Sequence, residues 1–360
     1  MARLHANAVK TEGESGRRAL ARNNFDFLRL VFSLGVVVFH AVALSAVAAF
    51  SATEAFLGLL AELSIQGFFI VSGALVYGSL QRSGSLGVYA EKRLRRLYPA
   101  YATIVLIPVL ISGFLTGWAG SEAILHYLGA NLIFLNFLAP ELPGLFDTNR
   151  FTEVNGALWT LKIEVMFYIA LPVLAWLLNV SGRLWWALLV AVYIAAEAWR
   201  HLMPLLLDHP FAPDIARQLP GQMAFFASGM LLWRTRDWAK MNVFVLLGVG
   251  AVLFAASFLH LGLSPLRPAG LAALVFALAY LPGLHIPAAR FGDVSYGLYI
   301  THFPILQALV MLGLFASLGF GLAFGLALAL VTAASVLLWH LVEKPALRRD
   351  SHYRKASETD

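Results

Sequence analysis

The chain has 360 residues, of which 60% are hydrophobic and only 13% are charged. A soluble domain carries about 25% charged residues, so the composition excludes an ordinary water-soluble enzyme and indicates an integral membrane protein. The absence of cysteine excludes disulfides, thiolate-bound metals and a cysteine nucleophile. We expect no nucleic-acid partner, because the net charge of +6 is explained by membrane orientation.

Ten apolar stretches predict an all-α bundle of about ten transmembrane helices. They cover residues 27–49, 57–79, 98–116, 157–179, 184–201, 219–234, 241–261, 266–282, 294–315 and 318–342. The apolar stretch 123–138 is short and carries His126, Asn131 and Asn136, so we expect it to be re-entrant or interfacial, with an eleventh span as the alternative. We expect a tail over 1–24, a transmembrane domain over 25–345 and a tail over 346–360, with no signal peptide and no attached soluble domain.

The distribution of lysine and arginine predicts the orientation. With ten spans and a cytoplasmic N-terminus, the inner segments hold 20 of the 26 basic residues, whereas the outer segments hold four. Cytoplasmic loops are enriched in lysine and arginine. We therefore expect both termini to be cytoplasmic.

The first span carries a polar stripe. Arg29 and His40 are eleven residues apart, which places them on nearly the same helical face, about 16 Å apart along the axis. Asp26, one turn before Arg29, can pair with it, and Ser33 continues the stripe. Ionisable groups inside a membrane are expensive and usually functional, although a snorkelling arginine with a hydrogen-bonded histidine is the structural alternative.

Three further segments carry polar residues that are candidates for a site. Small residues in the second span, including Ser72, predict close helix packing. Arg93 and Arg96 precede the third span, with Pro99 expected to open it; the pair is either a membrane anchor or a phosphate site. Glu164, at the expected outer end of the fourth span, is either part of a structural pair or an acid/base group.

The ninth span begins with Ser295, Tyr299 and His302 on one face, and these three side chains either cap the helix or line a site. Glu343, at the expected inner end of the last span, is a candidate partner for an arginine. No spacing of histidine and acidic residues indicates a zinc site, so we expect no metal.

Together these residues resemble acyltransferase family 3, the bacterial membrane proteins that O-acylate surface polysaccharides and related acceptors. Six segments match in order, from about residue 24 to 345: Arg29 and His40 as the basic-x10-His pattern, "FFIVSGALV", Arg93-Leu-Arg-Arg96, "LWTLKIEVMFY", "SYGLYITHFPI" and "LVEKP". The resemblance implies acyl transfer from cytoplasmic acyl-CoA, commonly acetyl-CoA, to a hydroxyl of a glycan or a lipid-linked saccharide. Membrane lipids are the other expected partners, and no oligomeric state is implied.

The resemblance and the polar stripe together suggest a mechanism. His40 is expected to be the general base, since imidazole titrates near neutral pH; a covalent acyl-histidine is the alternative. Glu164 is expected to orient the acceptor or assist His40. Arg29, Arg93 and Arg96 are expected to bind the phosphates of CoA, with Ser295 and Tyr299 along the donor channel. The supporting residues are expected to be Asp26, Ser72, Trp159 and His302.

A transporter or flippase is the competing function, because intramembrane arginine, histidine and glutamate also mark transport paths. Transporters commonly contain inverted repeats, and no such repeat is evident in this sequence.

Overall fold

The computed structural model describes residues 23–288, 292–348 and 351, and every regular element in these ranges is helical. Eight helical segments are long and apolar enough to cross a membrane. They contain α2 (Phe25–Ser45), α3 (Ser51–Gln81), α4 (Leu86–Thr116), α6 (Trp159–Val180), α7 (Trp185–Leu206), α12 (Arg267–Ala279), α13 (Val294–Met311) and α15 (Phe320–Leu338). The prediction of a multi-pass helical protein is therefore confirmed.

The other two expected spans correspond to short helices. α9 (Leu219–Arg234) has 16 residues and α11 (Val243–Ala256) has 14, whereas a core of about 30 Å needs about 20 residues in a helix. Short connecting helices α8 (Ala212–Ala216) and α10 (Arg236–Met241) flank α9, and α14 (Leu314–Ser317) and α16 (Lys344–Ala346) lie near the C-terminal end.

The start of α4 differs from the sequence prediction. The helix begins at Leu86, where the side chain of Ser85 accepts a hydrogen bond from the backbone N–H of Val88 (3.2 Å). Ser85 is thus the N-cap, and Pro99 lies inside the helix instead of opening it. Arg93 and Arg96 consequently project from a helix at a fixed spacing, and do not lie in a loop.

The stretch 123–138 enters the bundle and turns back. It forms α5 (Ser121–Leu132), whose 12 residues are too few to cross a membrane. The backbone carbonyl of Asn131 accepts a hydrogen bond from Tyr101, in the middle of α4, and the carbonyl of Pro143 accepts one from Ser112, near the end of α4. The segment therefore leaves at the end of the bundle from which it came, as a re-entrant segment does.

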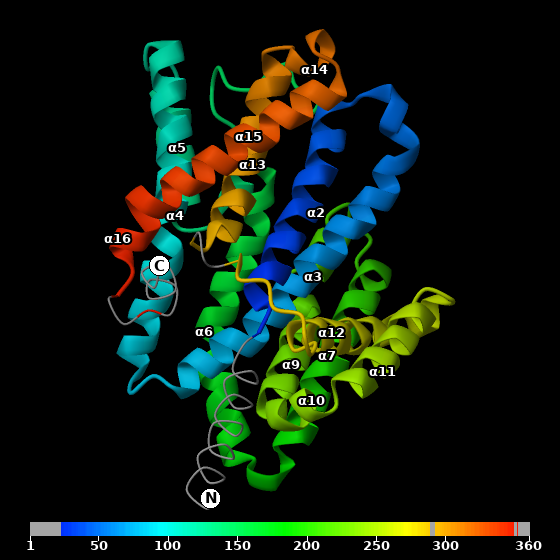
Figure 1. Ribbon diagram of the computed structural model, residues 1–360. Coiled ribbons are helices and arrows are strands. Elements are labelled where there is room, and N and C mark those ends of the chain that lie inside the picture. The colour runs from blue at the N-terminus through cyan, green and yellow to red at the C-terminus, as the bar shows by residue number, and fades with distance from the viewer. Residues whose placement is uncertain (1–22, 289–291, 349–350, 352–360) are drawn as a thin grey trace, which may run out of the picture.

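Figure 1 shows two groups of helices. One group, α7, α9, α11 and α12, gathers beside one end of α3. The other group consists of α2, α4, α6, α13 and α15. α3 belongs to both groups, because glycines let it approach its neighbours closely. A Cβ placed on Gly73 would come within 3.0 Å of the Phe226 backbone in α9, and one on Gly229 would do the same to the backbone of Ile70. This close approach fits the packing role expected for small residues in the second span.

Gly73→Ala is expected to destabilise the protein by about 1–3 kcal/mol, because the added methyl forces α3 and α9 apart. The midpoint of thermal unfolding in detergent measures this loss. Gly248→Ala is the control, since a Cβ at that helical position has no neighbour within 4 Å. Equal midpoints for the two variants would show that the contact is not tight.

α2 and α13 form a parallel pair, side by side in Figure 1. The hydroxyl of Ser33 donates to the backbone carbonyl of Ser295 (2.8 Å). Seven residues further along each helix, Nδ1 of His40 lies 2.8 Å from Nε2 of His302. We call the end where α2 and α13 begin the basic end, after Arg82, Lys92, Arg93 and Arg95 nearby. Asn23 and Ser351, the two described chain ends, line one cavity there. That this end is cytoplasmic stays a prediction.

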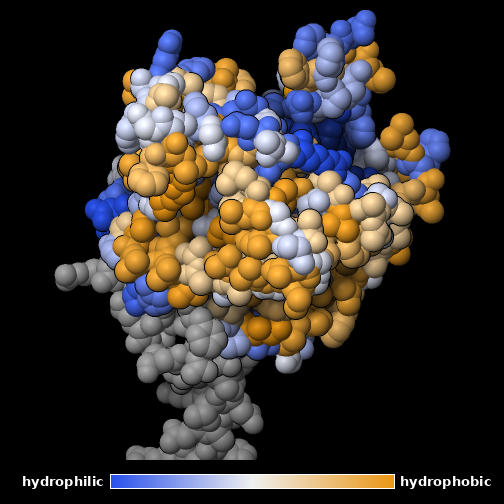
Figure 2. Space-filling model, turned by 90° about the horizontal axis from the view of Figure 1, so that it is seen from above, coloured by the Kyte–Doolittle hydropathy of each residue, from blue (hydrophilic) through white to orange (hydrophobic). Residues whose placement is uncertain are grey.

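The opposite end, which carries α14, is seen from above in Figure 2. Hydrophilic residues gather in a hollow on this end, and hydrophobic residues dominate the surface below it in this view.

Candidate active site

A cavity lies between α2, α3, α4, α6 and α13, and we call it the donor cavity. Seven of the residues that the sequence predicted for the site line it, namely Arg29, Ser72, Arg93, Arg96, Glu164, Ser295 and Tyr299. They come from five helices, so the fold brings together residues that lie up to 270 positions apart in the chain. Its apolar wall includes Ile65, Phe68 and Leu161.

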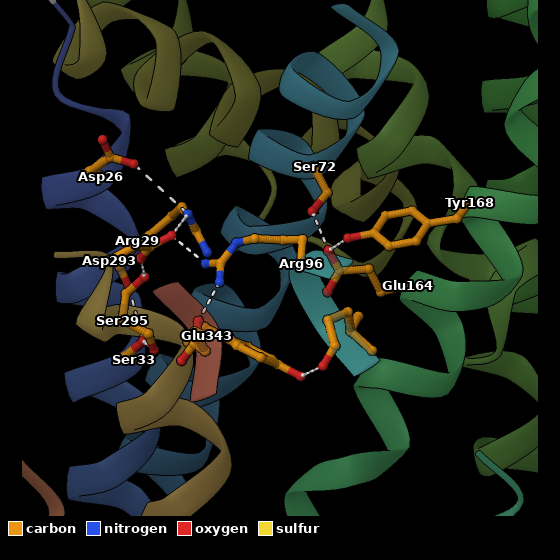
Figure 3. Close-up of polar contacts among 12 residues, drawn as sticks. Asp26, Arg29, Ser33, Ser72, Arg96, Glu164, Tyr168, Asp293, Ser295 and Glu343 are labelled. Atoms are coloured by element: carbon orange, nitrogen blue, oxygen red, sulfur yellow. Dashed lines mark hydrogen bonds and ion pairs between the residues drawn. The ribbon is translucent and has the colours of Figure 1, made fainter. Parts of the chain in front are cut away.

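One buried carboxylate, Asp293, holds two of the arginines (Figure 3). It forms ion pairs with Arg29 (2.7 Å) and with Arg96. Ser295, two residues further on, donates a hydrogen bond to the other carboxylate oxygen of Asp293 (2.6 Å). Burial acts to raise the pKa of Asp293, but the charges of Arg29 and then Arg96 outweigh burial and hold that pKa below its usual range. Asp293 is therefore ionised and binds both guanidinium groups.

Two further acids complete this network. Arg96 pairs with Glu343 (2.5 Å), which is the arginine partner that the sequence allowed for Glu343. Asp26 lies 3.8 Å from Arg29, as its position one turn earlier predicts, but Asp293 is the nearer acid. Three carboxylates thus surround two guanidinium groups at the basic end. Asp293 was not among the predicted site residues. Its position directly before an apolar helix, on the side of the arginine cluster, could have indicated it.

Arg93 has different surroundings from the other two arginines. Its side chain donates to the hydroxyl of Ser79 (3.3 Å) and lies 5.8 Å from the centre of the Tyr168 ring. Among the described residues it pairs with no carboxylate, and its Nε is buried without a hydrogen-bond partner. Arg93 therefore has charge and donor capacity to offer to an anion.

Glu164 lies at a different depth from the one predicted. Its carboxylate accepts hydrogen bonds from Ser72 (3.1 Å) and from Tyr168 (Figure 3). Ser72 is nine residues from Gln81, where α3 ends at the basic end, so Glu164 lies with the arginines and not beside His40. The prediction of an outer position was wrong because α6 begins inside the bundle, after the re-entrant segment. Tyr168, a further residue that the sequence prediction left out of the site, follows Glu164 by one turn.

A second cavity, the basic cavity, adjoins the first at Leu75, Arg93 and Arg96, which line both. Asp26 is the one acid among its described lining residues. Eight cationic residues line it: Arg82, Lys92, Arg93, Arg95, Arg96, Arg236, Lys240 and Arg348. Burial lowers the pKa of the Arg82 guanidinium, and the like charges of Arg236 and Arg93 lower it further. The cations therefore repel one another, and a bound polyanion would relieve that repulsion.

His40 and His302 form a hydrogen-bonded pair beyond the other end of the donor cavity. Nδ1 of His302 lies 3.2 Å from the carbonyl oxygen of Leu298, and a carbonyl can only accept, so this nitrogen carries the proton. Nε2 of neutral His302 is then an acceptor for Nδ1–H of His40, 2.8 Å away. It follows that Nε2 of His40 has a free lone pair. His302 is 0% exposed, whereas His40 is half-buried.

Tyr299 connects the donor cavity to the histidine pair. It lines the cavity, its hydroxyl bonds to Thr160 (2.7 Å), and its ring centre lies 5.9 Å from that of His302. Trp159, predicted to support the site, does not line the donor cavity; instead the guanidinium of Arg217 lies 4.8 Å from the centre of its ring.

Comparison with known proteins identifies the family of the chain. Residues 22–340 match the family described as Acyl_transf_3, acyltransferase domain. The chain is 27% identical to nodulation protein 10 of Rhizobium leguminosarum bv. viciae, over 91% of this chain and 94% of that protein. It is 28% identical to an O-acetyl transferase of Shigella phage Sf6, over 91% of this chain and 97% of that protein. It is 26% identical to the exopolysaccharide production protein ExoZ of Rhizobium meliloti, over 78% of this chain and 88% of that protein.

No solved structure matches the chain. The family match covers most of the sequence, including all five helices that line the donor cavity and the histidine pair. The chain therefore belongs to the acyltransferase 3 family, and it is a multi-pass membrane acyltransferase.

Proposed function

We propose that the protein transfers an acyl group, most simply acetyl, from cytoplasmic acyl-CoA to a hydroxyl of a glycan or glycolipid at the bacterial inner membrane. The observation that carries this proposal is the order in which the basic cavity, the donor cavity, Tyr299 and the histidine pair follow one another through the bundle. The relatives named O-acetyl transferase and exopolysaccharide production protein support the acyl group and the class of acceptor.

The basic cavity is the place for the phosphates of CoA. Five of its eight cations pair with no carboxylate in the described part of the chain and suit a ligand with several negative charges. These five are Arg82, Lys92, Arg93, Arg236 and Lys240. Arg93 is the best phosphate ligand of the three predicted arginines, because Arg29 and Arg96 are already bound to carboxylates. In this proposal Arg29 and Arg96 line the path of the donor, and Asp293 fixes them there.

The donor cavity then accommodates the pantetheine arm. Arg29 and His40 are about 16 Å apart along α2, so an extended arm can place its thioester near the histidine pair while the phosphates stay at the basic end. Glu164 accepts from Ser72 and Tyr168 and has further lone pairs for an amide N–H of the arm. This role replaces the expectation that Glu164 assists His40 directly.

The chemistry takes place at Nε2 of His40. This nitrogen removes the proton from the acceptor hydroxyl, and the oxygen attacks the carbonyl carbon of the thioester. The new C–O ester bond forms, the C–S bond breaks, and the CoA thiolate takes the proton from His40. His302 orients the ring of His40 and stabilises its protonated form by accepting from Nδ1–H. Release of free CoA by purified protein and a glycan acceptor is the direct assay.

Arg93→Ala is expected to raise the KM for acyl-CoA about 10- to 100-fold with little change in acceptor preference. A hydrogen bond to a charged group contributes about 1.5–3 kcal/mol, which corresponds to that range. Steady-state CoA release at varied donor concentration measures it. Arg183→Ala is the control, since Arg183 is exposed and lines none of the described cavities. An unchanged donor KM would remove Arg93 from the phosphate site.

A further inference from the structure

A third cavity lies between the re-entrant segment and the start of α6. Asn131, Asn136 and Phe137 line one side, and Glu153, Asn155 and Gly156 line the other. We call it the re-entrant pocket. The backbone path that forms it enters and leaves at the end of the bundle opposite to the basic end, as the contacts with Tyr101 and Ser112 show. Neither the donor cavity nor the basic cavity shares a residue with it.

Two asparagines hold the pocket together. The amide of Asn131 donates to the carbonyl of Ala139 (2.8 Å), which closes the re-entrant turn. The amide of Asn155 donates to the carbonyl of Ile300 in α13 (2.9 Å). These two side chains are buried and hydrogen-bonded to the backbone, so their role is to shape the pocket.

The other polar side chains are available to a ligand. Asn136 and Glu153 are half-buried, and neither side chain forms a hydrogen bond with another residue in the described part of the chain. Phe137 is 59% exposed, and the amino group of Lys162 lies 4.5 Å from the centre of its ring. The pocket therefore brings together an amide, a carboxylate and an aromatic ring, and the ammonium group of Lys162 lies over one face of that ring.

A single aromatic ring separates this pocket from the histidine pair. A Cβ placed on Gly156 would lie 2.9 Å from the ring of Phe303, so the pocket wall rests on that ring. The centre of the Phe303 ring is 5.1 Å from that of His40. On the side of the donor cavity, Tyr299 lies next to His302. On the side of the re-entrant pocket, Phe303 lies next to His40.

We propose that the re-entrant pocket binds the sugar that accepts the acyl group, and that this sugar is a neutral pyranose. Adjacent hydroxyls of a pyranose both donate and accept hydrogen bonds, which matches Asn136 and Glu153. The exposed face of Phe137 suits the apolar face of a sugar ring. Glu153 is the one charged residue among the described lining residues of the pocket, and its carboxylate would repel a uronic acid, which favours a neutral sugar. The inference rests on the proposed function, because it assigns the acceptor of that reaction.

Binding tests the pocket without any turnover. Saturation-transfer NMR is recorded on the purified full chain in detergent with methyl glucoside, galactoside and mannoside, and with methyl glucuronide. At least one neutral glycoside is expected to give a signal, and the glucuronide a weaker one. Phe137→Ala and Glu153→Gln are expected to lose the signal. Leu138→Ala and Glu122→Gln are the matched controls, because Leu138 and Glu122 are exposed neighbours that do not line the pocket.

Turnover separates this inference from the proposed function. Phe137→Ala and Glu153→Gln are expected to raise the KM for the neutral acceptor at least 10-fold and to leave slow hydrolysis of acetyl-CoA without acceptor unchanged. The assignment would be overturned if the KM for the acceptor did not change or if hydrolysis fell as much as transfer. It would also be overturned if no glycoside bound or if the glucuronide bound better than the neutral glycosides. Glycoside binding at the pocket with no CoA release by the wild-type protein would instead overturn the proposed function.

Discussion

Replacing His40 with alanine is expected to lower the rate of acyl transfer at least 100-fold while the protein remains folded. A positioned general base contributes about 10²- to 10⁴-fold, and Nε2 of His40 is the lone pair that the hydrogen bonds of the pair leave free. The protein is expected to persist because His40 is half-buried and its loss leaves no charged group unpaired. CoA release by the purified variant measures the effect, and gel filtration in detergent checks that it is folded.

Two variants and one mass measurement define the role of this pair. His302→Ala is expected to lower the rate about 10- to 100-fold, because His40 then loses the acceptor that orients it. His126→Ala is the control, since His126 is exposed on α5. The protein is incubated with acyl-CoA in the absence of acceptor and then quenched. A gain of one acyl mass on His40 would indicate the acyl-histidine route instead of proton removal. Transfer by His40→Ala close to that of the wild type would refute both routes.

Replacing Asp293 with alanine is expected to cost about 3–5 kcal/mol of stability, the largest loss among the described ion pairs. Removing one partner of a buried pair leaves an uncompensated charge in a medium of low dielectric constant. Asp293 serves two such partners, Arg29 and Arg96, and its side chain is 1% exposed. The midpoint of thermal unfolding in detergent is the measurement, with CoA release recorded at a temperature where the variant stays folded.

The matched control is Asp214→Ala. Asp214 also pairs with an arginine, Arg217 (2.8 Å), but its side chain is 52% exposed. Exposed pairs contribute about 0–1 kcal/mol, so this variant is expected to unfold close to the wild-type midpoint. Similar midpoints for the two variants would show that the network around Asp293 does not stabilise the bundle.

Helical periodicity predicted much of the site, because it depends on neighbours within one helix. The stripe from Arg29 to His40 and the spacing of Arg93 and Arg96 are local, and the structure places Arg29, Arg93 and Arg96 on one cavity. The pairing of His40 with His302 joins residues 262 positions apart. Periodicity shows which face of each helix is polar but not which helix lies opposite, so the partner stayed unassigned.

The two errors in the site have local causes. Pro99 was expected to open the third span because proline suits the first turn of a helix, yet Ser85 caps the helix 14 residues earlier. Glu164 was expected near the outer surface because the fourth span was assumed to start there. The chain leaves the re-entrant segment near Pro143 and then returns into the bundle, where Asn155 bonds to the carbonyl of Ile300, so α6 starts inside the bundle.

The parallel alignment of α2 and α13 also restricts how often the chain crosses the membrane. Two spanning helices that start on the same side require an odd number of crossings between them. Five of the long apolar segments, those with α3, α4, α6, α7 and α12, lie between α2 and α13. The short helices α9 and α11 must therefore either both cross or both stay within one leaflet. When all eight long apolar segments cross, the described chain is therefore expected to have eight or ten crossings, with its two described ends on one side of the membrane.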